Sequence, residues 1–103
     1  MQESSIEARL KKEIENSIPG AKCLKFVSPG FTGIPDRIIL LPHGRMAFAE
    51  LKRPGQKEKQ RQLFVQARLR RLGFTVFSAV DSPEKAQTVV DWARGIVQEG
   101  AQV

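Results

Sequence analysis

The stretch from residue 36 to residue 52 reads DRIILLPHGRMAFAELK and contains two apolar runs separated by a short polar connector. Residues 36–41 and 46–52 have the length and composition of β-strands. The connector between them has hairpin length and contains a proline and a glycine. We therefore expect the two strands to pair antiparallel, which would bring Asp36 and Glu50 to the open end of the hairpin.

The segment before this hairpin predicts one helix, one short strand and a loop. Apolar side chains recur every four residues from Ile6 to Ile18, which predicts a helix over residues 4–18. Residues 22–27 form a short strand candidate, and residues 28–35 are too rich in Gly and Pro for regular structure.

The segment after the hairpin predicts a helix, a strand and a final helix. Residues 57–72 are polar and basic with a narrow apolar stripe at Val65, Leu69 and Leu72, and Gly73 is expected to end this helix. Residues 75–79 are typical of a strand. Ser82-Pro83 provides an N-cap and a first-turn proline for a third helix, whose apolar face is formed by Ala86, Val89, Val90, Ala93 and Val97.

The resulting order, αβββαβα, predicts a single α/β domain over residues 1–103. A helix between the third and fourth strands permits a parallel crossover, so we expect a mixed β-sheet flanked by helices. With 103 residues, the chain is well below the size at which hydrophobic cores divide.

Composition predicts a soluble cytoplasmic protein that is not exported and has no membrane partner. The sequence has no long apolar run and does not begin with a basic and then apolar leader. Its single cysteine, Cys23, suits a reducing compartment and is interpreted as a small core residue. His43 has no acid or cysteine near it in the sequence and is interpreted as a turn residue, while Phe74 and Trp92 are interpreted as core or subunit-contact aromatics.

The formal net charge of +6 favours an anionic partner. The positive charge is concentrated in residues 51–80, which contain eight basic residues and one acidic residue. Such a run can be merely the solvated face of a helix, but its position directly after Glu50 and Lys52 favours phosphate binding. The candidate nucleic-acid contacts are Arg53, Lys57, Lys59 and Arg61.

Glu50 and Lys52 are two residues apart, so on a strand both side chains leave the same face. With Asp36 at the same end of the hairpin, two carboxylates can reach one ion. Mg²⁺ or Mn²⁺ would suit these oxygen ligands, with the backbone carbonyl of Leu51 as a third ligand. Lys52 could hold the attacking water or stabilise charge on phosphorus, and whether it is a general base is left open.

Simpler interpretations exist for each residue taken alone. Asp36 could be a turn acid after a proline, and Glu50 with Lys52 could be an edge charge pair. Jointly these interpretations are less favoured, because residues 46–51 otherwise form a buried strand and ionised side chains are rarely buried without a partner.

These residues resemble the PD-(D/E)XK nuclease superfamily, with Pro35-Asp36 and Glu50-Leu51-Lys52 as its two motif elements. The resemblance is strongest to the VRR-NUC domain, in which an acidic first helix, a Gly-x-Pro-Asp turn, a Glu-Leu-Lys strand end with a basic-Pro-Gly step, and a glutamine opening a helix follow in this order. The corresponding residues here are Glu7, Gly33-Ile34-Pro35-Asp36, Glu50-Leu51-Lys52-Arg53-Pro54-Gly55, Gln62 and Gly73.

This resemblance implies a restriction-endonuclease-like core and catalytic roles for Asp36, Glu50 and Lys52. It also implies a supporting carboxylate from Glu7 and a site-lining Gln62. Two alternatives stay open: Glu7 could be only the partner of Ser4 in a helix capping box, and Gln60 competes with Gln62 because the segment before it lacks the family's Leu-Ser step.

We therefore expect a metal-dependent DNA endonuclease that hydrolyses phosphodiester bonds. Stand-alone members of the branch imply a homodimer acting on branched or Holliday-junction DNA. The alternatives are a non-catalytic nucleic-acid-binding module with the same fold and an assembly subunit.

Overall fold

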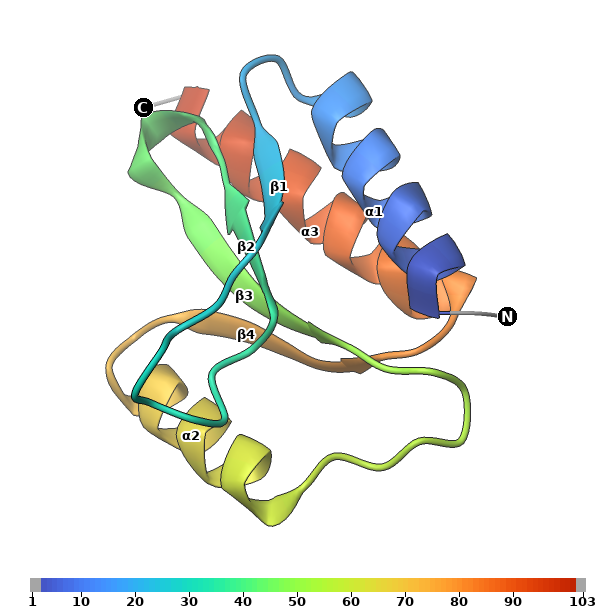
Figure 1. Ribbon diagram of the computed structural model, residues 1–103. Helices are drawn as coiled ribbons and strands as arrows, with labels where there is room; N and C mark the ends of the chain where they lie inside the picture. Colours follow the sequence, from blue (N-terminus) through green and yellow to red (C-terminus); the bar gives the residue numbers. More distant parts are fainter. Residues whose placement is uncertain (1–2, 102–103) are drawn as a thin grey trace.

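A four-stranded sheet lies at the centre of the structure, with α1 and α3 on one face and α2 on the other (Figure 1). The structure is a computed structural model that describes residues 3–101. Its elements are α1 (Glu3–Ser17), β1 (Lys22–Lys25), β2 (Arg37–Leu40), the short 3-10 helix η1 (Pro42–Gly44), β3 (Met46–Leu51), α2 (Gln60–Arg71), β4 (Thr75–Val80) and α3 (Pro83–Ala101). The predicted αβββαβα order is confirmed.

The strands follow the order β1-β2-β3-β4 across the sheet. The pairs β1–β2 and β2–β3 are antiparallel, whereas β3 and β4 are parallel and joined by the crossover through α2. The predicted hairpin and mixed sheet are therefore both confirmed. His43 lies in the η1 connector with a positive φ of 65°, which agrees with its interpretation as a turn residue.

The hydrophobic core lies between the sheet and the helices α1 and α3. Ile6, Leu10 and Ile14, which share one stripe of α1, are completely buried. The predicted apolar face of α3 belongs to the same core cluster as Ile39 of β2. Trp92 is partly buried in this layer and stacks edge-to-face on Phe77 of β4, with ring centroids 5.4 Å apart.

Glu15 connects α1 to the edge strand β1. Its Oε2 accepts hydrogen bonds from the backbone N–H of Cys23 at 3.0 Å and from Nζ of Lys11 at 2.9 Å. These two contacts, the Cys23 amide first, lower the pKa of Glu15. The Cys23 side chain is buried as predicted, and burial raises the pKa of its thiol to about 11.

Helix α2 begins three residues later than predicted and ends at the predicted glycine. Lys59 has extended backbone angles, and its N–H donates to Oε1 of Gln62 at 2.9 Å, so residues 57–59 do not join the helix. At the other end Gly73 has a φ of 99°, its N–H bonds to the Arg70 carbonyl, and the next N–H reaches back to Leu69. This is a Schellman motif, which explains why a glycine ends the helix.

The predicted apolar stripe of α2 is wrong at its last member. Val65 is buried, but Leu72 follows the last helical turn and is 74% exposed. The second fully buried side chain of this helix is polar, Gln66. The face of α2 that meets the sheet is therefore centred on Val65 and Gln66.

An irregularity in the β3–β4 pairing lies beside Glu50. Ala49 pairs with Phe77, but Leu51 pairs with Val80, so β4 contributes one residue more than β3 over this step. Ala79 adopts a φ of 48° within the irregularity. Bulges of this kind often occur next to functional sites, where they redirect side chains.

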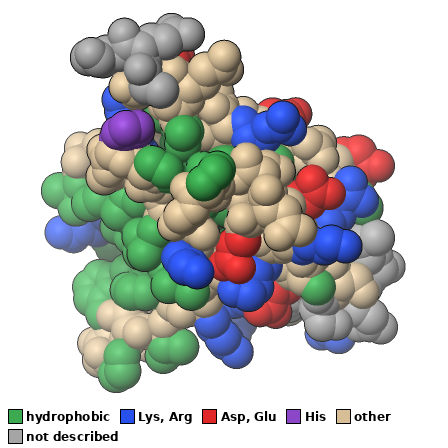
Figure 2. Space-filling view, turned by 90° about the horizontal axis from the view of Figure 1, so that it is seen from above, with side chains coloured by type: hydrophobic (Ala, Val, Ile, Leu, Met, Phe, Trp, Pro, Cys, Tyr) green, Lys and Arg blue, Asp and Glu red, His purple; other side chains and the backbone are tan. Residues whose placement is uncertain are grey.

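Helix α2 packs mainly on β4, and no other described helix lies on this face of the sheet, so its β1–β2 side is not covered by a helix (Figure 1). Leu24 of β1 and Leu40 of β2 are partly exposed there, as is Phe74, which contacts Phe48 edge-to-face at 5.7 Å. On the face shown in Figure 2, hydrophobic side chains gather at the left, whereas charged side chains lie mainly at the centre and right. Within residues 3–101, no helix has the length and apolar character needed to cross a membrane.

Candidate active site

The hairpin register brings Asp36 and Glu50 together. Arg37 pairs with Ala49, so the next residue outward on each strand is one of the two acids. Both acids line a pocket of about 410 Å³ between the end of the hairpin and α2. Its lining residues are Thr32, Gly33, Ile34, Asp36, Glu50, Lys59, Arg61 and Gln62. The predicted convergence of the two carboxylates is thus present in the structure.

Asp36 is fixed at the pocket wall by two neighbours. Its Oδ1 accepts a hydrogen bond from the backbone N–H of Leu51 at 3.0 Å, and its Oδ2 lies 3.3 Å from Nη1 of Arg37. The side chain remains 28% exposed. A carboxylate held in this way keeps lone pairs directed at the pocket while its position is set by the sheet.

Glu50 is a buried carboxylate without a full set of partners. Its Oε1 has no hydrogen-bond partner among the described residues, and its Oε2 lies 4.0 Å from Nζ of Lys52. Burial, followed by the negative charge of Asp36, raises the pKa of Glu50 to about 7. Since an ionised carboxylate in such a position is costly without compensation, the site favours a cation beside Glu50.

The raised pKa of Glu50 predicts a pH-dependent stability in metal-free protein. The folded state holds the proton up to about pH 7, whereas the unfolded carboxyl loses it near its ordinary value of 4.5. Stability should therefore fall as pH rises between these values, by about 3 kcal/mol for this group. The measurement is urea unfolding in EDTA from pH 4 to pH 8 for the wild type and Glu50→Gln.

The difference between the two proteins isolates Glu50, because every other titrating group is common to both. The stability of Glu50→Gln should exceed that of the wild type at pH 8 and approach it near pH 4. Mg²⁺ should narrow the gap at pH 8 by stabilising the ionised carboxylate. Parallel stability curves with no pH-dependent gap would contradict this account of Glu50.

Lys52 is buried and held by Gln62 of α2. Its Nζ donates to Gln62 Oε1 at 3.0 Å, and the same oxygen accepts the Lys59 N–H described above. Gln62 lines the pocket, whereas Gln60 is exposed at the start of the helix. Of the two candidate glutamines, the structure places Gln62 in contact with the Glu50–Lys52 pair.

If the site cleaves DNA, as the resemblance implies, replacing Gln62 with leucine should lower the cleavage rate by about ten-fold or more, because a hydrogen bond to a charged group contributes about 1.5–3 kcal/mol. Gln60→Leu is the matched control, since it makes the same chemical change two residues away on an exposed position. The measurement is single-turnover cleavage of labelled DNA. Equal loss of rate in both variants would contradict the assignment of Gln62.

Arg37 is a site neighbour that sequence reasoning missed. Its guanidinium is buried, donates to the Asp36 carbonyl at 2.8 Å, and forms an ion pair with Glu7 at 2.8 Å between Nη2 and Oε2. The signal was available, because Arg37 is in phase with the buried Ile39 on its strand. A charged residue in phase with a buried strand face requires a partner.

Glu7 therefore contacts Arg37 and does not line the pocket. Its carboxylate is connected to Asp36 only through the Arg37 guanidinium. The alternative role in a capping box depends on Ser4, whose side chain is not among those that the structure describes. A catalytic role for Glu7 stays a prediction.

A chain of polar contacts centred on the buried Gln66 was also missed. The amide of Gln66 donates to Glu58 and accepts from the Ser78 hydroxyl, which in turn accepts from Arg70 at 2.9 Å. These contacts join the loop before α2, the helix itself and β4. Sequence alone provides no reason to prefer Gln66 over other glutamines, because its partners lie in three separate segments.

The four candidate nucleic-acid contacts are all exposed, and two of them belong to the pocket. Lys59 and Arg61 line it, whereas Arg53 and Lys57 lie in the loop between β3 and α2. None of the four forms an ion pair with any described residue. Their positive charges are therefore available to an anionic ligand.

The donor set fits a hard divalent cation that keeps several waters. Within residues 3–101, no three or more His, Cys, Asp or Glu side chains lie together as metal ligands, so a cation here would depend on two carboxylates and on water. Asp36 and Glu50 supply two carboxylates, and the unpartnered Oε1 of Glu50 is a buried acceptor that a cation would satisfy. Mg²⁺ commonly binds through one or two carboxylates together with waters and substrate phosphates.

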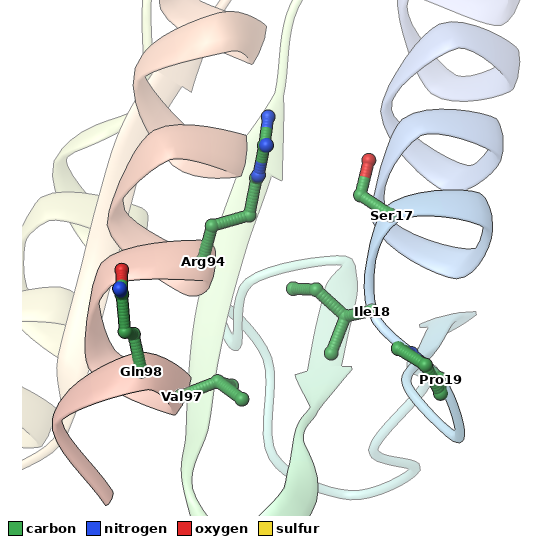
Figure 3. Close-up of a pocket in the computed structure, with 6 residues that line it drawn as sticks. All are labelled: Ser17, Ile18, Pro19, Arg94, Val97 and Gln98. Carbon is green, nitrogen blue, oxygen red and sulfur yellow. The ribbon is translucent and has the colours of Figure 1, made fainter. Parts of the chain in front are cut away.

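A second pocket lies where the end of α1 faces the last turns of α3. It has a volume of about 230 Å³, and Figure 3 shows Ile18 and Val97 on facing sides with Arg94 beside them. Its other lining residues are Ser17, Pro19 and Gln98. None of the described residues that line this pocket has a carboxylate, so they provide no ligands for metal chemistry.

Two comparisons with known proteins agree with this geometry. "Putative nuclease p44" from Acyrthosiphon pisum secondary endosymbiont phage 1 is 45% identical over 76 residues, which cover 74% of this chain and 80% of that protein. A solved structure described as a VRR_NUC domain superposes with a TM-score of 0.72 at 25% identity, covering 88% of this chain and 97% of that one. No family model matches the chain.

Proposed function

Because the chain belongs to the VRR-NUC family of nucleases, we propose that it hydrolyses phosphodiester bonds of DNA with Mg²⁺ or Mn²⁺ as cofactor. The observation that carries this proposal is the buried Glu50, whose Oε1 has no hydrogen-bond partner among the described residues and whose neighbour across the hairpin is a second carboxylate. A protein that only binds DNA gains nothing from two acids facing a polyanion. A metal-dependent nuclease requires them.

Asp36 and Glu50 would hold the ion, with the backbone carbonyl of Leu51 as a further ligand. Asp36 is well placed for this role because the Leu51 N–H and Arg37 fix its orientation. The bound ion would polarise the phosphodiester and lower the pKa of a bound water. Arg37 and, through it, Glu7 act by positioning Asp36.

Lys52 would order the attacking water or stabilise charge that builds on phosphorus. Gln62, which lines the pocket, holds the Lys52 ammonium group by a hydrogen bond, and the Gln62 carbonyl oxygen is itself fixed by the start of α2. Lys59 and Arg61, which line the same pocket, would bind the phosphates on either side of the cleaved bond, and Arg53 with Lys57 would contact the backbone further away.

We propose further that the enzyme is a homodimer acting on branched or junction DNA. A two-fold substrate needs two cuts, and each chain provides one site. The exposed apolar side chains of β1 and β2, which include Leu24 and Leu40, offer a surface that a second copy could cover.

The test compares a labelled four-way junction with linear duplexes of the same sequence, in Mg²⁺, Mn²⁺ or EDTA. We expect cleavage that requires metal and favours the junction, together with a dimer mass by light scattering. Binding without cleavage in either metal would support the alternative of a non-catalytic binding module. Cleavage in EDTA would contradict the metal mechanism.

A further inference from the structure

Two aromatic side chains are exposed beside the pocket and share an arginine. Phe31 lies in the loop before β2 and is 45% exposed, and Phe64 lies on the outer face of α2 and is 51% exposed. The guanidinium carbon of Arg61 is 5.0 Å from the Phe31 ring centroid and 5.7 Å from that of Phe64. Arg68, one helical turn after Phe64, approaches its ring at 5.9 Å.

This cluster is anchored to the pocket wall. Nε of Arg61 donates to the Thr32 carbonyl at 3.1 Å, which joins α2 to the loop that carries Phe31. The loop approaches so closely that a Cβ added to Gly33 would lie 2.9 Å from Cγ of Arg61. Thr32, Gly33 and Arg61 all line the pocket that contains Asp36. The segments that carry the two rings therefore meet at the wall of the pocket that contains the two carboxylates.

Exposed aromatic rings interleaved with arginines are a combination that proteins use to bind single-stranded nucleic acid. Bases stack on aromatic rings, and arginine adds charge for the adjacent phosphates and a planar stacking surface of its own. The rings here gain little from the protein interior, since about half of each remains in solvent. Arg61 also lines the pocket, so one DNA strand could place a phosphate in the pocket and the attached base on the two rings.

We propose that Phe31 and Phe64, with Arg61 linking these rings to the pocket, form a stacking site for an unpaired DNA base next to the cleaved phosphate. This inference rests on the proposed nuclease function and specifies its substrate. In a fully paired duplex, the base would have to leave the stack at a cost of a few kcal/mol. DNA that already presents an unpaired nucleotide, as at a branch point, gap or flap, is therefore the preferred ligand.

A second copy of the chain fits this surface less well. A two-fold contact through the same face would bring Arg61 and Arg68 of one copy against those of the other. Like charges at short range oppose such a contact. The polyanionic strand is the complementary occupant.

The experiment measures the affinity of the full chain, in EDTA, for a duplex with one unpaired base and for the same duplex with an abasic residue at that position. We expect the wild type to bind the base-containing DNA about ten-fold more tightly, and Phe31→Leu or Phe64→Leu to reduce this preference to about two-fold or less. Leu63→Ala is the matched control, because Leu63 is 50% exposed on the same helix and has no aromatic ring on which a base could stack. It should keep the full preference.

Equal affinity of the wild type for the two DNAs would overturn the proposal, as would an equal loss of affinity for both in the phenylalanine variants. A change from dimer to monomer in these variants by light scattering would assign the surface to a contact between copies and would also overturn it. Since binding in EDTA needs no hydrolysis, this result is separate from the nuclease test. Cleavage of the junction without a preference for the base-containing DNA would contradict only the proposed stacking site. A preference for the base-containing DNA without cleavage would contradict only the proposed nuclease function.

Discussion

Glu50→Gln should lower the metal-dependent cleavage rate by about 100-fold or more while leaving the protein folded. The reason is that the amide removes the charge that holds the cation, and a loss of about 3 kcal/mol of transition-state stabilisation corresponds to this factor. The fold should tolerate the change, because Glu50 is buried with an unpartnered Oε1 and a raised pKa. The measurement is single-turnover cleavage of junction DNA at saturating Mg²⁺.

Asp36→Asn should have an effect of similar size, and both variants should bind DNA with equal or higher affinity, since each removes a negative charge that faces phosphate. Glu99→Gln is the control for the loss of one acid, because Glu99 is exposed near the end of α3 and does not line the pocket. Wild-type cleavage by either pocket variant would show that the catalytic carboxylates have been misassigned.

Gly33→Ala should destabilise the protein by about 2–6 kcal/mol. Gly33 has a φ of 93°, where an alanine pays about 1–3 kcal/mol in backbone strain. The new methyl group would also lie 3.0 Å or less from Arg61 and 3.0 Å from Cγ2 of Val65, so overpacking adds about 1–3 kcal/mol. The check is the free energy of unfolding in urea.

Gly30→Ala separates the two contributions. Gly30 lies in the same loop at a φ of 83°, but nothing lies within 4 Å of the point that a Cβ would occupy there, so only backbone strain remains. The variant should therefore lose less stability than Gly33→Ala. If the two variants lost equal stability, close packing between the loop and α2 would not be the reason for a glycine at position 33.

The sequence predicted the elements whose signals are local. The four-residue repeat from Ile6 to Ile18, the hairpin connector and the glycine after α2 each report on a few neighbouring residues, and each is confirmed. The prediction that Leu72 belongs to the apolar stripe was wrong, because it extended helical spacing past Arg71, the last residue of α2. The positive φ of Ala79 had no sequence signal, since it follows from how β4 pairs with β3.

The site divides in the same way. Asp36 and Glu50 could be placed in one pocket because hairpin pairing fixes their register. Arg37 was missed although its strand phase indicated burial, and its partner Glu7 comes from a helix whose position against the sheet the sequence does not give. Gln66 could not have been found, because its neighbours Glu58 and Ser78 meet only when the crossover is complete.

The single buried thiol can report on local unfolding at the edge of the sheet. Cys23 holds its proton in the folded state, with a pKa of about 11, and is shielded on β1 by α1. A maleimide dye should therefore react only when this edge strand separates from the helix, because the reagent needs a thiolate that it can reach. The labelling rate would then measure how often β1 separates from α1 in the unmodified protein, with and without Mg²⁺ or DNA.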